Sequence, residues 1–312
     1  GIDLNGTADD DQFGESVALS DDGNWLIAGA TGHDVTLNSN HGHVKVYQWD
    51  SGGSTWDPRG AIEGVSAGDK FGFSVDINTD GSVVAIGSKI ANSDTGQTRM
   101  YSWNSGGSTW VPRGAIDGNT AGDKSGVSIS LSGDGTRVAI GSKMNDGNGT
   151  NSGHTMVHEY SGSAWSPFGS DLYGDTGDRA GIVSLSTDGS TLAIGSPNTP
   201  GSSTVTGNAR IYNHDGSDWV QIVDNINGEV LGDEAGSAVS LSGDGSTLIV
   251  GSPEHDSQRG HARVFRVNES IGIPDGSTTG NLQVVVLNDA LVEANETIVV
   301  DINSVAGDTN DG

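Results

Sequence analysis

One turn sequence recurs five times along this chain at nearly constant spacing. The Asp-Gly pairs begin at Asp22, Asp80, Asp134, Asp188 and Asp244, which lie 58, 54, 54 and 56 residues apart. Apolar residues alternate before each pair, and a second apolar run follows it. This pattern predicts a β-hairpin in every repeat, because the glycine can adopt the positive φ that such a turn requires. The chain is therefore expected to fold as a set of similar repeated units.

Each repeat has the signals of four strands. In the second repeat, Val75 and Ile77 alternate in the first strand, Gly87 ends the second, Tyr101 lies in the third and Trp110 opens the fourth. Four strands in about 55 residues is the size of a propeller blade, whose hydrophobic faces are buried only by neighbouring blades. We predict an all-β fold, a β-propeller of four-stranded antiparallel blades with five repeats in this chain, plus a short β tail. The alternative is a fragment of a six- or seven-bladed ring.

The residues that open and close the strands of each repeat are similar to those of a known family. Phe13-Gly14 and Phe71-Gly72 open the first two repeats, and later repeats run to Ile-Gly-Ser or Val-Gly-Ser-Pro. Over residues 9–267 this resembles the FG-GAP repeat of integrin α-subunit propellers and, more closely, its bacterial relatives. The resemblance implies an integrin-like propeller in an extracellular or cell-surface protein, with a role in binding or cell adhesion.

The repeat pattern ends after Val267, where the fifth unit lacks a Trp-led fourth strand. Residues 282–287 and 297–302 are apolar runs that flank an acidic segment, which resembles the second half of a Calx-β module. The predicted domains are a propeller over residues 1–267 and a linker with a partial Calx-β-like segment over 268–312. Because an unpaired blade edge invites another strand, we expect this tail to dock on a β-edge of its own propeller or of a neighbouring chain. Docking on a neighbour would propagate into a filament.

The charge balance restricts the possible partners. The chain has 41 acidic and 14 basic residues, a formal charge of −27 and no cysteine. Such a protein would repel a nucleic-acid backbone, and it has no disulfides or thiol chemistry. Its apolar runs fall short of the roughly 20 residues that a membrane helix needs. The expected partner is a protein or glycan ligand at a surface, with no nucleic acid and no membrane span.

One aspartate precedes the opening of each repeat by two residues. These residues are Asp11, Asp69, Asp123, Asp178 and Asp233. In a propeller they would form a ring on one face. Each carboxylate could accept backbone N–H bonds and fix its own loop, a common use of Asp in turns. The other interpretation is a cation or ligand site at the mouth of the channel.

Two further groups of oxygen ligands suggest calcium. Asp289, Glu293 and Glu296 lie close together between two apolar runs, and clustered carboxylates repel one another unless a cation neutralises them. In the second repeat, Asp76, Asn78 and Asp80 approach the calcium loop of the integrin relatives. Val84 replaces the last carboxylate of that loop, and the corresponding loops of the other repeats are expected to be plain hairpin turns. We predict Ca²⁺ in the tail and a second, poorer site in the second repeat.

No catalytic or cofactor-binding residues are assigned. The sequence has no H-E-x-x-H pair and no phosphate-binding loop, and His43, His154 and His261 share one repeat position, which favours a structural role. The chain is therefore predicted to be an extracellular non-catalytic module for binding, adhesion or matrix and filament formation, and not an enzyme. The alternative is a hydrolase or lyase that acts on polysaccharide, with a site at the propeller mouth.

Overall fold

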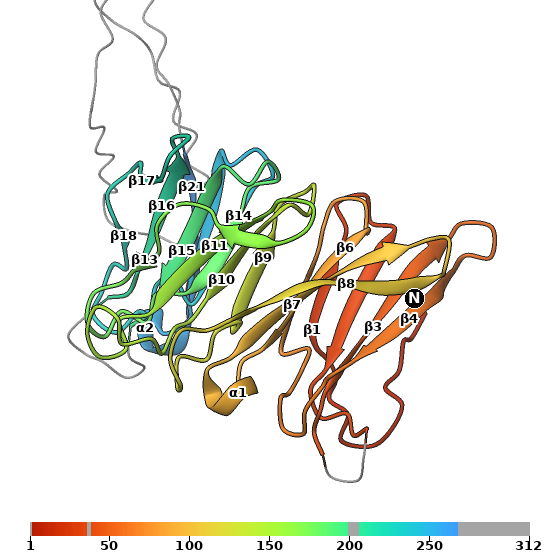
Figure 1. Cartoon of the computed structure of the whole chain (residues 1–312). Helices are drawn as coiled ribbons and strands as arrows, with labels where there is room; N and C mark the ends of the chain where they lie inside the picture. The colour runs from red at the N-terminus through yellow and green to blue at the C-terminus, as the bar shows by residue number, and fades with distance from the viewer. Residues whose placement is uncertain (1, 36–38, 199–205, 268–312) are drawn as a thin grey trace, which may run out of the picture. The chain divides into compact units, whose positions relative to one another are not determined.

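The computed structural model describes residues 2–35, 39–198 and 206–267, which form five antiparallel sheets in chain order (Figure 1). Sheet 1 contains β1 (Phe13–Leu19), β2 (Trp25–Ala30), β3 (His43–Asp50) and β4 (Thr55–Glu63). Sheet 2 contains β5 (Ser74–Ile77), β6 (Val83–Ser88), β7 (Gln97–Asn104) and β8 (Thr109–Asp117). Sheet 3 contains β9 (Ser128–Leu131), β10 (Arg137–Gly141), β11 (His154–Tyr160), β12 (Trp165–Pro167) and β13 (Leu172–Tyr173).

The last two sheets follow the same plan. Sheet 4 contains β14 (Ile182–Leu185), β15 (Thr191–Ser196), β16 (Asn208–His214), β17 (Trp219–Gln221) and β18 (Ile226–Asn227). Sheet 5 contains β19 (Ala238–Leu241), β20 (Thr247–Ser252) and β21 (His261–Arg266). Two single helical turns, α1 (Ala91–Asp94) and α2 (His255–Gln258), lie in the loops that follow β6 and β20. The predicted all-β fold of antiparallel propeller-type sheets is confirmed, and the number of blades stays a prediction.

The Asp-Gly segments form the hairpin turns that the sequence predicts. In sheet 3, Ser132 Oγ and the Thr136 N–H both donate to Asp134 Oδ1, at 2.7 and 2.9 Å. Gly135 has a φ of 65°, which a glycine adopts without strain. The other four turns repeat this arrangement, with the carboxylates of Asp22, Asp80, Asp188 and Asp244. The aspartate therefore caps the turn from inside the hairpin.

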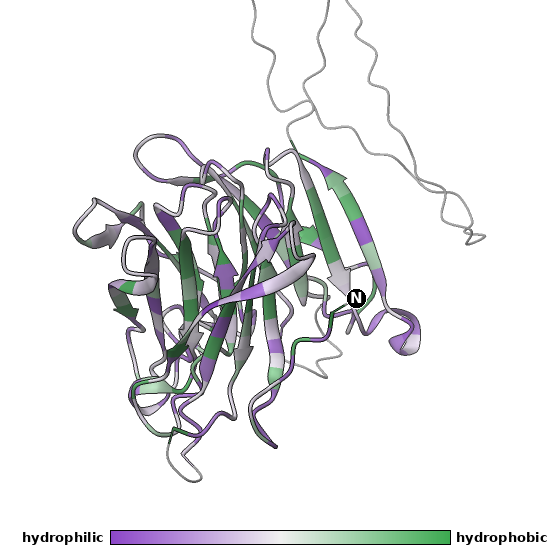
Figure 2. Ribbon diagram, turned by 90° about the vertical axis from the view of Figure 1, so that its right-hand side faces the viewer, coloured by the Kyte–Doolittle hydropathy of each residue, from purple (hydrophilic) through white to green (hydrophobic). Residues whose placement is uncertain are grey.

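Hydrophobic residues lie largely along the strands (Figure 2), and the core that they form lies between consecutive sheets. Four clusters of buried side chains join sheet 1 to sheet 2 and so on to sheet 5. Tryptophans at the start of the outer strands reinforce these contacts. The indole Nε1 of Trp110, Trp165 and Trp219 donates to a carbonyl oxygen of the preceding sheet at 3.1, 3.1 and 2.8 Å. Each indole thus buries its ring and satisfies its only donor.

Glycine pairs set the distance between neighbouring sheets. A Cβ on Gly141, at the end of β10, would overlap the carbonyl oxygen of Gly181, which precedes β14. Gly29 and Gly72 make the same approach between sheets 1 and 2. The Phe-Gly signal at residues 71–72 therefore marks a close contact between backbones, and any set of sheets stacked side by side can use glycine in this way.

The two end sheets expose apolar side chains. Val17 and Leu19 of sheet 1 are 64% and 57% exposed, and Val264 of sheet 5 is 55% exposed. Within residues 2–35, 39–198 and 206–267, no hydrophobic cluster joins sheet 5 to sheet 1. In the same residues, no helix has the length and apolar character needed to cross a membrane. The predicted tail strands and the boundary at 267/268 fall at or within residues 268–312, outside the described part.

Candidate functional site

A polar pocket lies where the innermost strands of all five sheets converge. Its volume is about 280 Å³. The lining residues come from β1, β5, β9, β14 and β19 and from the turns that follow them. They are Leu19, Asp21, Asp76, Ile77, Asn78, Thr79, Ser130, Leu131, Gly133, Leu185, Thr187, Ser240, Leu241 and Gly243. The convergence of five sheets on one cavity is the arrangement expected around the axis of a propeller.

Hydrogen bonds between successive turns build the rim of this pocket. The Thr79 N–H donates to Gly133 O at 3.1 Å, the Gly133 N–H to Thr187 O at 2.6 Å, and the Thr187 N–H to Gly243 O at 2.8 Å. Thr79 also reaches back to sheet 1, because its Oγ1 donates to Asp21 Oδ2 at 2.6 Å. Equivalent positions of five turns are thus tied together at one end of the pocket.

Asp76 is a carboxylate at a position where the last three repeats have serine and the first has Ala18. Its Oδ2 accepts the Leu131 N–H at 2.7 Å, which links β5 to β9. Ser130 and Ser184 hold the same place in sheets 3 and 4, and their Oγ atoms accept the backbone N–H of the next sheet at 3.0 and 2.9 Å. A serine therefore suffices for the contact between sheets. The contact between sheets thus does not require the carboxylate of Asp76.

The surroundings of Asp76 disfavour its ionised form. The pKa of this carboxyl is raised from 3.8 to about 6, chiefly by burial and to a smaller extent by the charge of Asp21. The N–H groups of Leu131 and Ile77 oppose the shift by donating to its two oxygens. A carboxyl with a pKa near neutrality can accept and return a proton at the pH at which most enzymes work. Two carboxyl groups whose environments differ are a common basis for acid and base chemistry.

The pocket also restricts the charge of a ligand. Its lining includes Asp21 and Asp76 and, among the described residues, neither Lys nor Arg. A phosphorylated or otherwise anionic molecule would meet repulsion there. The hydroxyl and amide groups of Ser130, Thr187 and Asn78 instead suit a neutral polyhydroxylated molecule.

The five aspartates predicted to form a ring lie at the other end of the innermost strands. Each accepts a backbone N–H from a residue three positions earlier, as Asp123 does from Thr120 at 2.9 Å and Asp178 from Asp175 at 3.0 Å. Asp11, Asp69 and Asp233 make the corresponding bonds. Such bonds are the ones expected if each aspartate fixes its own loop. A ligand role for the ring stays a prediction.

The three residues of the second predicted calcium site, Asp76, Asn78 and Asp80, do not all lie in one place. Asp76 and Asn78 line the central pocket, whereas Asp80 does not. Asp80 Oδ1 accepts bonds from Asn78 Nδ2 at 3.0 Å and from the Ser82 N–H at 2.9 Å, inside the turn. Asn78 Oδ1 accepts the Val83 N–H at 2.8 Å. The first calcium group, Asp289, Glu293 and Glu296, lies outside the described residues.

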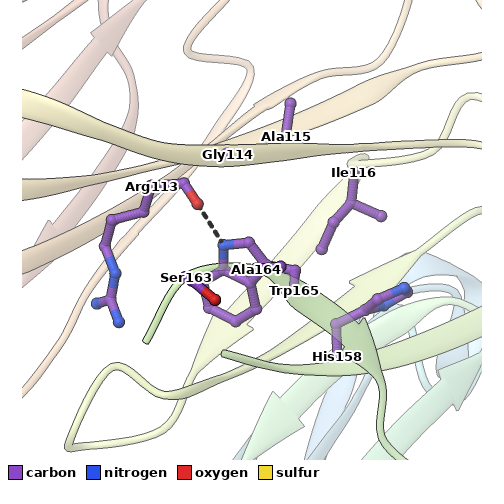
Figure 3. Close-up of a pocket in the computed structure, with 8 residues that line it drawn as sticks. All are labelled: Arg113, Gly114, Ala115, Ile116, His158, Ser163, Ala164 and Trp165. Atoms are coloured by element: carbon purple, nitrogen blue, oxygen red, sulfur yellow. Dashed lines mark hydrogen bonds between the residues drawn. The ribbon is translucent and has the colours of Figure 1, made fainter. Parts of the chain in front are cut away.

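A second, larger cavity lies between the outer parts of sheets 2 and 3 (Figure 3). Its volume is about 420 Å³, and it is lined by residues of β8, β11 and β12, including Arg113, His158 and Trp165. Burial lowers the pKa of His158, so this imidazole is neutral near pH 7. The lining has no carboxylate. This cavity consequently lacks the paired acid groups that distinguish the central pocket.

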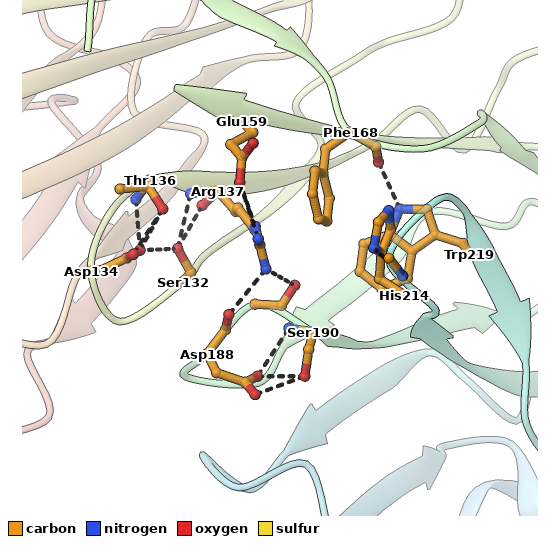
Figure 4. Close-up of polar contacts among 12 residues, drawn as sticks. Ser132, Asp134, Thr136, Arg137, Glu159, Phe168, Asp188, Ser190, His214 and Trp219 are labelled. Carbon is orange, nitrogen blue, oxygen red and sulfur yellow. Dashed lines mark hydrogen bonds and ion pairs between the residues drawn. The ribbon is translucent and has the colours of Figure 1, made fainter. Parts of the chain in front are cut away.

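An arginine between sheets 3 and 4 is occupied by structural contacts (Figure 4). Arg137 Nε donates to Glu159 Oε1 at 3.0 Å, and its Nη1 donates to the carbonyl oxygens of Asp188 and Gly189 at 3.2 and 3.3 Å. Its guanidinium also lies 4.0 Å from the centroid of the Phe168 ring. This side chain bridges two sheets and is not available to a ligand.

Sequence reasoning missed Asp21 and the serines of the inner strands. Asp21 comes directly before the turn aspartate of the first repeat, where later repeats have Thr or Gly. Alignment of the five repeats would have identified it as an exception, as it would for Asp76. The sequence also missed two places where imidazole and carboxylate groups that could hold a metal ion converge: His33, His43 and Glu63, and Glu229, His255 and His261. In each of these two trios the ligand atoms lie within 4.8 Å of one another.

Comparisons with known proteins identify the fold. No known family profile matches the sequence, and no curated protein matches it. Among solved structures, a putative 6-phosphogluconolactonase from Bacteroides uniformis is similar with a TM-score of 0.56 and 14% identity, over 85% of this chain and 69% of that one. The hydrazine synthase of Kuenenia stuttgartiensis has a TM-score of 0.51 and 14% identity, over 80% and 70% of the two chains. The periplasmic gluconolactonase of Pseudomonas aeruginosa has a TM-score of 0.50 and 12% identity, over 84% and 76%.

These comparisons correct the interpretation from the sequence. The resemblance to integrin-like FG-GAP repeats and the Calx-β-like tail is not supported, because the similar structures are lactonase-type propellers and no family profile matches. The predicted adhesion, matrix or filament module is wrong for the same reason. The prediction that the chain is not an enzyme is overturned as well, since the similar structures are named as enzymes. At 12–14% identity the likeness shows the propeller fold alone, and the function must be argued from the site.

Proposed function

We propose that this protein is a hydrolase that opens a neutral sugar lactone in the central pocket, with Asp76 as the general base. The observation that carries the proposal is the carboxyl of Asp76, whose pKa is raised to about 6 in a pocket shared by five sheets. Two of the similar structures are named as lactonases, which favours a cyclic ester as substrate. The acidic lining favours an uncharged aldonolactone over a phosphorylated one.

The chemistry needs a base, a donor to the carbonyl and a path for one proton. In the proposed reaction Asp76 takes a proton from water, and the resulting hydroxide adds to the lactone carbonyl carbon. The ring C–O bond then breaks, and the leaving oxygen takes the proton back from Asp76, which gives the open hydroxy acid. Ser130 is the proposed donor to the carbonyl oxygen. Its Oγ accepts the Leu185 N–H at 3.0 Å and so keeps its own proton to donate.

Hydrolysis of gluconolactone, followed as proton release above the spontaneous rate, tests this proposal. General-base catalysis contributes roughly 10²–10⁴-fold, so Asp76→Ser should lower the catalysed rate by at least 100-fold. Asp76→Ser retains the contact between sheets, because serine makes it elsewhere in the chain. Ser240→Ala, a change in the same pocket but outside the proposed mechanism, is the matched control and should stay within about twofold. An uncatalysed wild-type reaction, or an unchanged rate in Asp76→Ser, refutes the proposal.

We propose calcium as a ligand of the same pocket, with Asp76 supplying a carboxylate oxygen, the ligand type that Ca²⁺ prefers. Calorimetric titration of the wild type and of Asp76→Ser separates this site from the predicted site at Asp289, Glu293 and Glu296. Loss of one equivalent in Asp76→Ser supports the pocket site, and equal uptake by the two proteins contradicts it.

We further propose an extracytoplasmic location. The periplasmic origin stated for the Pseudomonas aeruginosa gluconolactonase supports it. Fractionation of cells that express the native gene is the test, and recovery in the cytoplasmic fraction alone would contradict it.

A further inference from the structure

Two histidine pairs occupy equivalent places in the first and last sheets. His33 follows β2 and His43 opens β3, whereas His255 follows β20 and His261 opens β21. The ring centroids lie 3.8 Å apart in the first pair and 3.9 Å apart in the second. Both pairs lie at the end of the strands that carries Asp11 and Asp233, opposite the turns of the central pocket. They are therefore separate from the proposed catalytic site.

Each pair is completed by a glutamate. Glu63 Oε2 lies 3.5 Å from His33 Nε2 and 3.9 Å from His43 Nδ1. Glu229 Oε2 lies 3.9 Å from His261 Nδ1. The ligand atoms of each trio lie within 4.8 Å of one another. The two glutamates come from different places in the repeat: Glu63 ends β4 of the same sheet, and Glu229 follows β18 of the preceding sheet. Two histidines and one glutamate thus come together in both places, although the glutamate comes from a different position in the repeat each time.

One histidine of each pair has a ring nitrogen without a partner. His43 is 2% exposed, and neither of its ring nitrogens has a hydrogen-bond partner among the described residues. His261 Nε2 is likewise buried without a hydrogen-bond partner in the described part of the chain, whereas its Nδ1 is the atom that faces Glu229. A buried polar atom without a partner costs about 1–3 kcal/mol, so native proteins rarely leave one without a reason.

The other histidine of each pair is oriented by a buried aspartate. His33 Nδ1 lies 3.2 Å from Asp11 Oδ1, and His255 Nδ1 lies 3.1 Å from Asp233 Oδ1. Asp11 is 4% exposed and Asp233 is fully buried. This contact leaves Nε2 of His33 and His255 free for a metal ion. A carboxylate behind a metal-binding histidine is the usual outer shell of a zinc site, because it fixes the orientation of the ring.

We infer that the trios His33–His43–Glu63 and Glu229–His255–His261 are two binding sites for a divalent transition-metal ion of the zinc type. Two imidazoles and one carboxylate are a donor set of zinc, and water or a further ligand takes the fourth position. Tetrahedral ligands about 2.0–2.1 Å from zinc are roughly 3.4 Å apart, so the ligand atoms of each trio must move together on binding. The rings of His255 and His261 lie 16° from parallel, and one of them must also turn so that both nitrogens face one ion. The first site should bind more tightly, because Arg263 Nη1 lies 3.5 Å from Glu229 Oε1 and competes for that carboxylate.

Zinc titration of the full chain without a histidine tag tests the inference. All eight histidines precede residue 262, so no imidazole ligand comes from the part of the chain after 267. Excess Ca²⁺ in the buffer saturates sites made only of oxygen ligands. Metal-free protein should take up two equivalents of Zn²⁺, and Co²⁺ in its place should give the visible absorption of a tetrahedral ion. Saturating zinc should raise the melting temperature by roughly 5–10 °C.

Substitutions assign the two equivalents. Glu63→Gln and Glu229→Gln should each lose one equivalent, and the double variant should lose both. These glutamates are 48% and 47% exposed, so the variants should fold. The matched control is His154→Gln, because His154 opens β11 at the same repeat position, but Asn145 stands in the place of the second histidine. Failure of the wild type to bind Zn²⁺, full uptake by the double variant, or an equal loss in His154→Gln overturns the inference.

Discussion

Replacement of Asp76 by serine is expected to make the protein more stable and inactive. The pKa of this carboxyl rises from 3.8 to about 6 on folding, which corresponds to roughly 3 kcal/mol against the ionised form in the folded state. Serine removes the charge and keeps an acceptor for the Leu131 N–H, as Ser130 and Ser184 do in the next two sheets. Allowing for the lost bond from the Ile77 N–H, the expected gain near pH 8 is about 2 kcal/mol.

The pH dependence of this gain identifies its cause. Because the folded-state pKa is the higher one, the contribution of Asp76 to stability is fully present below 3.8 and is lost as the pH rises through about 6. The advantage of Asp76→Ser over the wild type should therefore fall to about a third of its value by pH 5 and vanish between about pH 4 and pH 5.

Thermal unfolding of both proteins across this pH range is the assay. The melting temperature should rise by roughly 4–8 °C near pH 8. A stabilisation that does not change with pH, or a variant less stable than the wild type near pH 8, would refute the argument that the charge of Asp76 is held at a cost. A variant that is more stable but inactive would show that the protein keeps the carboxyl of Asp76 for function at a cost in stability.

Three further substitutions test the packing between sheets. Gly141→Ala places a Cβ against the backbone oxygen of Gly181 and should lower the free energy of unfolding, measured in urea, by about 3 kcal/mol or more. Gly52→Ala, on an exposed turn, is the control and should be nearly neutral. An unchanged stability in Gly141→Ala would contradict the close approach of the two backbones. Arg137→Ala should lower the free energy of unfolding by about 1–2 kcal/mol, because it removes an ion pair and a ring contact. If this loss disappears in high salt, the ion pair alone is responsible and the ring contact contributes nothing. Trp165→Phe removes one hydrogen bond to a carbonyl and should cost about 1 kcal/mol by the same measurement; no change in the denaturation midpoint would show that the bond contributes nothing.

The strands could be predicted from the sequence because their signals are local. Alternation at Val75 and Ile77, and an Asp-Gly turn three residues later, specify a hairpin without reference to the rest of the chain. The family could not be inferred in the same way. A glycine such as Gly72 is required by the backbone of a neighbouring sheet, and that requirement is common to many propellers.

The site was recognised in part. Asp76 was singled out from the sequence, but it was grouped with Asn78 and Asp80 because these residues match a linear calcium pattern. Its partner in the pocket, Asp21, lies 55 residues earlier and reaches the same cavity through the turn of another sheet. The change in the pKa of Asp76 arises from burial, which no spacing in the sequence reveals.

The convergence of all five innermost strands on one pocket has a consequence for cooperativity. The hydrophobic clusters join each sheet to its neighbours in chain order, so the stability of the array is close to a sum of sheet and nearest-neighbour terms. In such an array the end sheets open first, and hydrogen exchange should be fastest there. A molecule bound in the pocket would contact sheets that are distant along the chain. Its binding would add an interaction free energy that couples sheet 1 to sheet 5. With the pocket occupied, the sheets should therefore unfold together in one cooperative transition, where the free protein opens sheet by sheet.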